Sequence, residues 1–192
     1  QPFHPGYAAT LAVTGFALVS PVSILLPDGT AFVTVTVTDS KAEIVTLTLT
    51  ETSATPLSEV PGTVTFIPGP ASQVVVVPAS EPSPGTSDSA TVTIEVRDSD
   101  GNVVTSHPDY SATVGVTGSA AVLPTSITIP NGTGSVTIVA TDTVAEIVTV
   151  TLTETSTTGL TAVPGTVTFI AGSAANVVVI SATEAAPGTA NS

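Results

Sequence analysis

The sequence predicts an all-β protein made of tandem β-sandwiches, and three observations carry this prediction. Apolar residues alternate with threonine along many short segments, as they do on half-buried strands. Turn sequences separate these segments about every 8 to 12 residues, which is typical of a sandwich. The chain also repeats at a period of 103 residues, because residues 1–89 align on residues 104–192 without a gap and 52 of the 89 pairs are identical. A period of this length fits a whole domain and exceeds that of a solenoid repeat or a propeller blade.

The first copy contains three segments with the clearest alternation. They are VTVTVTD at 33–39, EIVTLTLTE at 43–51 and GTVTFI at 62–67. Their β-branched residues suit a pleated surface that is buried on one side. We therefore expect a strand in each segment, and no stretch of the chain shows the apolar spacing of a helix.

In the second copy the same reasoning predicts the strands of one complete sandwich. The expected ranges are 73–78, 89–97, 102–106, 110–116, 119–129 with a break at Pro124, 134–141, 145–154 and 162–170. Glycine supplies the positive φ angle of the connecting turns DSDGN at 98–102, PNG at 130–132 and PDG at 27–29. Residues 68–70 and Gly172 are the expected domain junctions.

The phase of the repeat predicts three segments. Residues 1–71 are expected to form an incomplete domain without counterparts of 72–103, residues 72–171 a complete domain, and residues 172–192 the opening strand of a further repeat or a donor strand. An incomplete sandwich exposes unpaired backbone groups along its edge strands. Two explanations stay open: the chain is a window of a longer tandem array, or its C-terminal strand completes the first domain of another copy. In the second case the assembly strand is Val177, Val178, Val179 and Ile180.

Composition and charge exclude several classes of partner. The net charge is −13, and Lys41 and Arg97 are the only lysine and arginine, so binding to nucleic acid is not expected. The longest apolar run, ASQVVVVPA, is far shorter than the roughly 18 residues of a membrane span, so no membrane insertion is expected. The chain has no cysteine for disulfides or thiolate sites. Rich in threonine and poor in lysine, it is expected to be secreted and to lie at the cell surface.

Three stretches carry a resemblance to a known family. They are ATVTIEVRDSDGNVV at 90–104, GSVTIVATDTVAEIVTVTLTE at 134–154 and PGTVTFIAG at 164–172. They resemble the bacterial immunoglobulin-like (Ig-like) repeats of invasin and intimin type surface proteins. The resemblance implies Ig-like Greek-key sandwiches used in tandem as stalks of cell-surface adhesins and other secreted proteins. It carries over no catalytic residue, so the sequence predicts no enzyme.

The turn at 98–102 is the candidate metal site. Asp98, Asp100 and Asn102 place oxygen ligands at alternating positions, as calcium loops do, but no distal acidic ligand follows at the spacing of an EF-hand. A hairpin turn held by hydrogen bonds from its own Asp and Asn side chains is the favoured interpretation, so no metal or other cofactor is expected, and calcium is the alternative. Asn131, in the sequence NGT at a turn, is the predicted glycosylation acceptor.

Four glutamates recur in register, two in each copy: Glu43, Glu51, Glu146 and Glu154. Within a copy they lie eight residues apart on one strand, which separates them by roughly 26 Å at the usual rise. That distance is too large for the acid and base of a glycosidase, so we expect them at the solvated ends of the strand. Tyr7 and Tyr110 are each expected to begin a strand and to bury their rings in a core.

Together these features predict a non-enzymatic extracellular structural protein. Its Ig-like repeats are expected to join head to tail, with adjacent repeats or copies of itself as partners, into a cell-surface filament or adhesin stalk. The alternative is a spacer or carbohydrate-binding module of a secreted hydrolase. That alternative requires an exposed aromatic platform, whereas the two tyrosines and five phenylalanines stand mostly within predicted strands.

Overall fold

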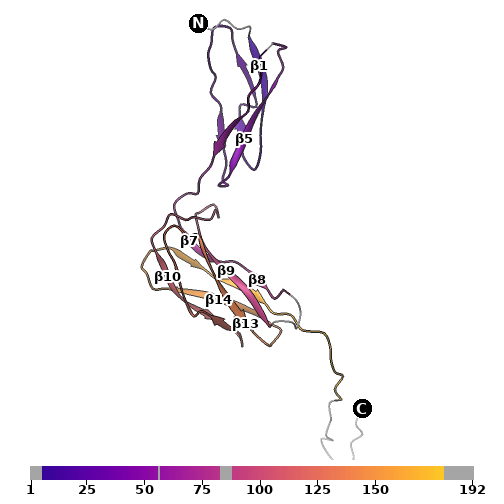
Figure 1. Cartoon of the computed structure of the whole chain (residues 1–192), viewed down its shortest axis with the longest axis vertical. Helices are drawn as coiled ribbons and strands as arrows, with labels where there is room; N and C mark the ends of the chain where they lie inside the picture. The colour runs from indigo at the N-terminus through magenta and orange to yellow at the C-terminus, as the bar shows by residue number, and fades with distance from the viewer. Residues whose placement is uncertain (1–5, 56, 83–87, 180–192) are drawn as a thin grey trace, which may run out of the picture.

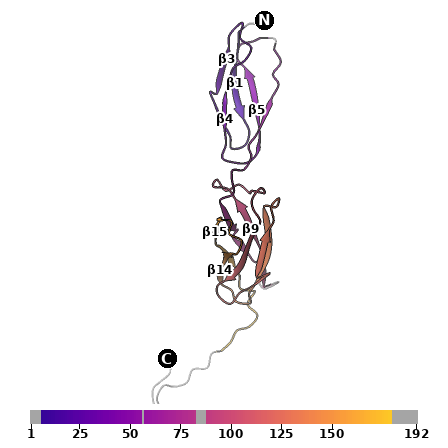
Figure 2. The same cartoon turned by 90° about the vertical axis from the view of Figure 1, so that its left-hand side faces the viewer.

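The computed structural model describes residues 6–55, 57–82 and 88–179. The regular secondary structure in these ranges consists of β-strands alone, so the predicted all-β class is confirmed. The described ranges contain no helix that could span a membrane. The strands form two domains placed end to end, the first from β1 to β6 and the second from β7 to β16 (Figures 1 and 2).

The second domain is a sandwich of two five-stranded sheets. One sheet has the order β12 (Ser126–Ile129), β10 (Tyr110–Val116), β14 (Ile147–Glu154), β16 (Gly165–Thr168) and β8 (Ala79–Ser80). The other has the order β11 (Ala121–Leu123), β13 (Ser135–Thr141), β9 (Ser89–Arg97), β7 (Gln73–Val76) and β15 (Thr161–Val163). The pairs β9–β13 and β10–β14 join strands that are distant in sequence, as in the Ig-like Greek key.

Alternation along the strands builds the core of this domain. In β9 the side chains of Ala90, Val92, Ile94 and Val96 are buried, and the residues between them face outward. Valines and isoleucines from both sheets pack against these four, together with the fully buried ring of Tyr110. The expected burial of the tyrosine rings is confirmed, since Tyr7 is buried in the first domain.

The first domain has a four-stranded and a two-stranded sheet. The larger has the order β3 (Ser23–Leu26), β1 (Tyr7–Val13), β5 (Ile44–Glu51) and β6 (Gly62–Thr65), and the smaller pairs β2 (Leu18–Ser20) with β4 (Thr36–Thr38). Strands β1, β2, β3, β5 and β6 begin and end 103 residues before β10, β11, β12, β14 and β16. Within residues 6–55 and 57–71 no strand takes the place of β7, β8 or β9. The domain boundaries at 71 and 171 stay predictions.

The uncovered sheets leave the apolar side chains of the first domain partly exposed. Val35 is half-buried where its counterpart Ile138 is buried against β9, and Val64 is half-buried where Val167 is buried. The half-buried set is Val19, Ile24, Leu26, Val35, Leu47, Val64 and Phe66; the buried counterparts are Val122, Ile127, Ile129, Ile138, Val150, Val167 and Phe169. The first domain therefore has the apolar residues of a sandwich core, but the described ranges contain no counterparts of β7 to β9 to bury them.

Three predicted strands differ from the observed ones. Residues 102–106 form only an isolated bridge between Val103 and Arg97, because both edges of β9 are taken by β7 and β13. The predicted strand 162–170 is two strands in different sheets, β15 and β16, which separate at Pro164, a residue without an N–H to donate. The predicted strand 33–39 shortens to β4, which in the described part of the chain has no neighbour in the place of β9. The predicted break at Pro124 is confirmed between β11 and β12.

Candidate functional site

The turn at 98–102 follows β9 and is organised by one buried aspartate. Asp98 is 1% exposed, and its Oδ1 accepts hydrogen bonds from the backbone N–H of Asp100 (3.0 Å) and of Asn102 (2.8 Å). Gly101 takes a φ of 87°, in the left-handed region that favours glycine. The chain thus forms the hairpin turn with side-chain to backbone hydrogen bonds that the sequence predicts.

The same turn connects the two domains. The Asn102 Oδ1 accepts from the N–H of Ala42 (3.0 Å), and its Nδ2 donates to the carbonyl of Ser40 (2.9 Å). The Asp98 Oδ2 accepts from the N–H of Gly69 in the linker (2.8 Å) and from Asn102 Nδ2 (3.0 Å). We call these five residues the junction clasp. It holds the β4–β5 turn of the first domain and the linker against the second domain.

The linker beside the clasp is short and stiff. Pro68 and Pro70 flank Gly69, so two of the three residues have a fixed φ angle. Ser72 N–H donates to the carbonyl of Arg97 at 2.9 Å, which joins the linker to the end of β9. A cavity of about 440 Å³ lies alongside, lined by Ile67, Pro68, Gly69, Pro70, Val104, Thr105 and Ser106. The linker that the clasp binds therefore has little conformational freedom of its own.

The charge of Asp98 strengthens the clasp. Burial acts to raise the pKa of this carboxyl, but hydrogen bonds from the Asn102 side chain and from the backbone N–H groups of Gly69, Asn102 and Asp100 outweigh it and lower the pKa to about 2. Asp98 is therefore an anion at neutral pH. Hydrogen bonds to an ionised acceptor are stronger than those between neutral groups.

The candidate calcium ligands are placed in this same turn. Both oxygens of Asp98 and the amide oxygen of Asn102 accept hydrogen bonds, while Asp100 is exposed. Within residues 6–55, 57–82 and 88–179 no group of three or more His, Cys, Asp or Glu side chains is placed to hold a metal ion. The sequence does not favour calcium binding by Asp98, Asp100 and Asn102, and this alternative stays untested.

The four recurring glutamates hold loops. Glu43 Oε1 accepts from Phe16 N–H at 2.7 Å, and Glu146 Oε1 accepts from Ser119 N–H at 2.7 Å, so each closes the turn after the first strand of its copy. Glu51 and Glu154 accept from the hydroxyl and the N–H of the threonine four residues later, Thr55 and Thr158. These hydrogen bonds lower the pKa of both Glu51 and Glu154. Sequence reasoning missed this role, although the repeated pattern E-T-S-x-T at 51–55 and 154–158 signals it.

The predicted assembly strand lies beyond β16. Val177, Val178 and Val179 belong to no strand and are 100%, 76% and 89% exposed, and Ile180 lies outside the described residues. Val177 and Val179 align on Val74 and Val76 of β7, which are 0% and 1% exposed in the core of the second domain. The tail thus repeats a strand whose inward side chains are buried elsewhere in the molecule.

The predicted glycosylation acceptor is accessible. Asn131 is exposed in the turn between β12 and β13, where Gly132 takes a φ of 91°. Its backbone N–H donates to Asp109 Oδ1 at 2.8 Å, and no described hydrogen bond involves its side chain. Glycosylation of Asn131 stays a prediction.

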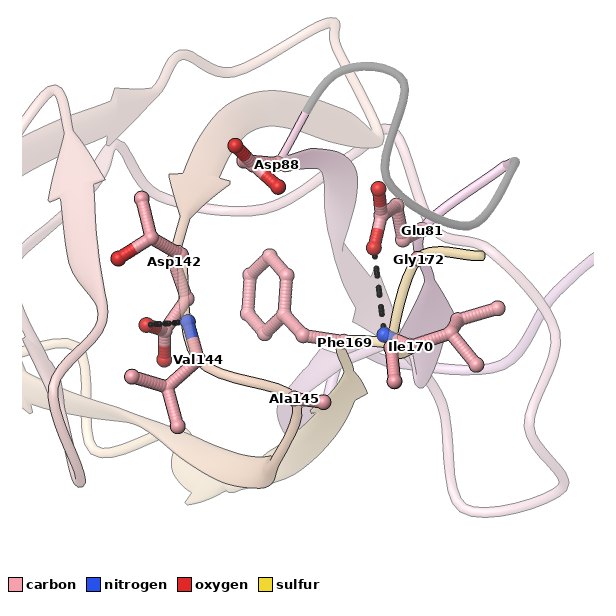
Figure 3. A pocket seen from close by; sticks show the side chains of 10 residues that line it. Glu81, Asp88, Asp142, Val144, Ala145, Phe169, Ile170 and Gly172 are labelled. Carbon is pink, nitrogen blue, oxygen red and sulfur yellow. Dashed lines mark hydrogen bonds between the residues drawn. The ribbon is translucent and has the colours of Figure 1, made fainter. Parts of the chain in front are cut away.

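A pocket of about 300 Å³ lies at the opposite end of β9 from the junction clasp, because Asp88 before this strand lines it and Asp98 follows the strand; Figure 3 shows the pocket from close by. In Figure 3, Phe169 lies between Asp142 on one side and Glu81 on the other, with Gly172 beside Glu81. Asp142 and Glu81 are 6% and 3% exposed, and Asp142 Oδ2 and Glu81 Oε1 are buried without a hydrogen-bond partner among the described residues. The described residues of the domain thus leave two polar atoms of this pocket unpaired.

No protein-family model matches the chain, and no curated protein does. Among solved structures it is similar to the D0-D1 domain of intimin, with 17% identity, a TM-score of 0.35, and coverage of 85% of this chain and 81% of that one. It is also similar to the Yersinia pseudotuberculosis adhesin InvE (14% identity, TM-score 0.38, 89% of this chain, 55% of that one). A β-glycosidase from Bacteroides vulgatus matches at 12% identity and TM-score 0.38, over 85% of this chain and 21% of that one. Intimin and an adhesin are thus among the neighbours, as the sequence resemblance predicts. At these TM-scores the likenesses carry no argument about function.

Proposed function

We propose that this chain is a non-enzymatic extracellular structural protein whose Ig-like domains join end to end into a cell-surface stalk or filament. The junction clasp is the observation that carries the proposal. It makes three hydrogen bonds from one turn of the second domain to the first domain and the linker, through Ala42, Ser40 and Gly69. At about 0.5–1.5 kcal/mol each, with the larger values for the charged acceptor, these bonds favour one fixed arrangement of the domains. A stalk needs such stiffness, whereas a flexible tether does not.

The end-to-end arrangement is tested by removing the clasp without changing the domains. We expect Asn102→Ala to increase the range of interdomain angles, seen in solution scattering as a broader distribution of distances and in NMR as divergent rotational diffusion of the two domains. Asp100→Ala is the matched control, because Asp100 lies in the same turn but is exposed. Equal interdomain order in Asn102→Ala and Asp100→Ala would contradict the proposal.

We further propose that the first domain is completed by strands in the positions of β7 to β9, supplied by a neighbouring part of the fibre. Gly62 is the residue that supports this most directly. In the second domain its counterpart Gly165 lies against β7, and an added Cβ would meet the carbonyl oxygen of Val76 at 2.2 Å. Around Gly62 an added Cβ would meet nothing within 4 Å. The first domain therefore keeps a glycine that becomes necessary only when a strand covers it.

The half-buried side chains of the first domain support the same proposal. Val35 and Val64 are half-buried, whereas their counterparts Ile138 and Val167 are buried in the core to which β7 and β9 contribute. Burial of one such aliphatic side chain contributes about 1.5–3 kcal/mol. Completion by a strand would stabilise the first domain through these side chains and through the ladder hydrogen bonds of its edge strands.

A peptide with the sequence of residues 72–97 tests this completion. We expect it to bind the chain and to slow amide exchange in β4 and β6. A peptide with Val74→Thr and Val76→Thr should not bind, because these side chains are buried, whereas one with Val75→Thr and Val77→Thr should bind. Gly62→Ala in the chain should also abolish binding. Equal binding of both altered peptides would overturn the proposal.

A further inference from the structure

We propose that the pocket at the far end of the second domain receives the D-x-D-G-N turn of a following Ig-like domain, a second copy of the one that carries residues 98–102. The inference rests on the proposed end-to-end function and deepens it by naming the partner surface and its chemistry. It is carried by the positions, the local geometry and the unpaired groups of the pocket.

The receiving groups of the junction clasp have counterparts at the pocket. Ser40, Ala42 and Gly69 bind the 98–102 turn through a carbonyl and two N–H groups. The residues 103 positions later are Thr143, Ala145 and Gly172, and all three line the pocket. Because the clasp uses backbone groups, the change from Ser40 to Thr143 does not alter the chemistry offered.

The backbone around these groups has the same local geometry at both ends. Asp39 Oδ1 accepts from Lys41 N–H at 2.8 Å, and Asp142 Oδ1 accepts from Val144 N–H at 2.9 Å. The turn is fixed to the last strand in the same way in both domains: the N–H of Phe66 donates to the carbonyl of Glu43 at 2.8 Å, and the second domain repeats this bond at 2.9 Å. The second domain therefore presents its carbonyl and N–H groups in the frame that holds the 98–102 turn on the first.

The groups at the pocket are free to bind a partner. The Thr143 carbonyl and the N–H groups of Ala145 and Gly172 make no hydrogen bond within residues 6–55, 57–82 and 88–179. Ala145 is exposed, whereas Ala42 is half-buried beneath the turn that it binds. Among the described residues neither Asp142 Oδ2 nor its counterpart Asp39 Oδ2 beside the clasp has a hydrogen-bond partner, so this atom is the same at both surfaces. Ala145 is the receiving residue that differs in exposure from its counterpart, since Thr143 and Gly172 are exposed like Ser40 and Gly69.

Two carboxylates distinguish the pocket from the first junction. Glu81 and Asp88 line it, and residues 6–55 and 57–71 contain no segment equivalent to the one that carries them. The incoming turn is itself acidic, so these groups repel it. Asp88 is exposed, and salt screens its repulsion of the exposed Asp100 of the incoming turn, so docking should become tighter as ionic strength rises. The Ile170 N–H donates to Glu81 Oε2 at 3.2 Å, and Glu81→Gln keeps an oxygen that can accept this bond. Because the variant removes a negative charge, it should tighten docking at low salt.

An extended chain tests the inference, with residues 90–171 repeated directly after Ser192. Residues 172–192 align on 69–89, so this addition supplies a complete further domain. We expect amide exchange of Ala145 and Gly172 to slow at least about tenfold relative to the chain of 192 residues, as for other N–H groups that gain a hydrogen bond. Ala42 and Gly69 in the same molecule are the internal reference for an occupied junction.

Variants in the added copy make the result specific. Asn102→Ala placed there should return Ala145 to fast exchange, and Asp100→Ala placed there should leave it protected. If Ala145 and Gly172 exchange as in the shorter chain while the added domain is folded and Ala42 and Gly69 stay protected, the inference is overturned and the proposed function stands. If Ala42 and Gly69 are themselves unprotected, the end-to-end function fails as well.

Discussion

At the residue scale, the junction depends on an amide that donates and accepts at once. Asn102 donates to the carbonyl of Ser40 and accepts from the N–H of Ala42, so an ionised aspartate, which only accepts, cannot replace both bonds. Asp98 lies beneath it and fixes its orientation through Oδ2. The predicted turn chemistry was correct. Its interdomain role was not predictable, because Ser40 and Ala42 take part through backbone groups that leave no signature in the sequence.

Acid should loosen the junction through Asp98. Its pKa is about 2 in the folded chain, below the value of about 3.9 for an unfolded aspartate. The stability that Asp98 contributes is therefore present above about pH 4 and is lost as the pH falls towards 2. We expect the thermal midpoint to fall more steeply over this range in the natural chain than in Asp98→Asn. Parallel acid profiles of the two proteins would show that Asp98 is not the group responsible.

The two buried tyrosines should respond differently to loss of their hydroxyl. Tyr7 donates to Glu59 Oε1 at 3.0 Å, whereas the Tyr110 hydroxyl is buried with no partner among the described residues, because Ala162 stands at the position of Glu59. We expect Tyr7→Phe to destabilise the first domain by about 0.5–1.5 kcal/mol. Tyr110→Phe should leave the second domain unchanged or more stable. Urea unfolding followed separately in β1 and β10 measures both, and a larger loss in Tyr110→Phe would contradict the assignment.

At the element scale, strands with clear alternation could be predicted to within a few residues, and those that depend on distant partners could not. The prediction for β9 matched at both ends, since its buried side chains alternate without interruption. The predicted strand at 102–106 failed because its place beside β9 was already filled. Likewise β4 is shorter than its sequence allows, since among the described residues it pairs with β2 alone, whereas its counterpart β13 also pairs with β9. Sequence periodicity reports which residues suit a strand, and pairing depends on what lies alongside.

Gly165 and its counterpart Gly62 test whether β7 packs against β16. An alanine at 165 puts its Cβ against the carbonyl oxygen of Val76, a backbone atom that moves only with its strand. We expect Gly165→Ala to destabilise the second domain by about 1–3 kcal/mol, as overpacking does. Gly62→Ala should leave the stability of the isolated chain within about 0.5 kcal/mol, as expected for a site away from packed groups. Calorimetry of the two variants gives the comparison, and equal losses would mean that β7 does not determine the effect.

At the scale of the whole molecule, the repeat predicted two domains in series but gave no geometry for their contact. The order of the domains follows from a 103-residue period, and the half-buried side chains of the first go with the lack of counterparts of β7 to β9 within residues 6–55 and 57–71. The clasp instead joins residues 29 to 62 positions apart in sequence. No periodic signal connects them, so the structure was needed to find them.

The predicted assembly strand is tested by the solution behaviour of the chain. If Val177 and Val179 insert into the first domain of another copy, concentrated protein should form linear oligomers that appear as filaments under negative stain. Val177→Thr together with Val179→Thr should abolish them, because the aligned residues of β7 face the core, while Val178→Thr should not. Monodisperse monomers at high concentration in sedimentation would contradict the assembly strand.

The parallel pairing of β7 with β15 and of β8 with β16 determines how the second domain bears force. The chain enters through β7 and leaves after β16, so tension along a stalk draws these neighbouring strands in opposite directions along their own length. They cannot separate by peeling one bond at a time. The ladder hydrogen bonds between them must slide and break together, which makes this domain resist pulling most strongly along the axis on which a stalk is loaded.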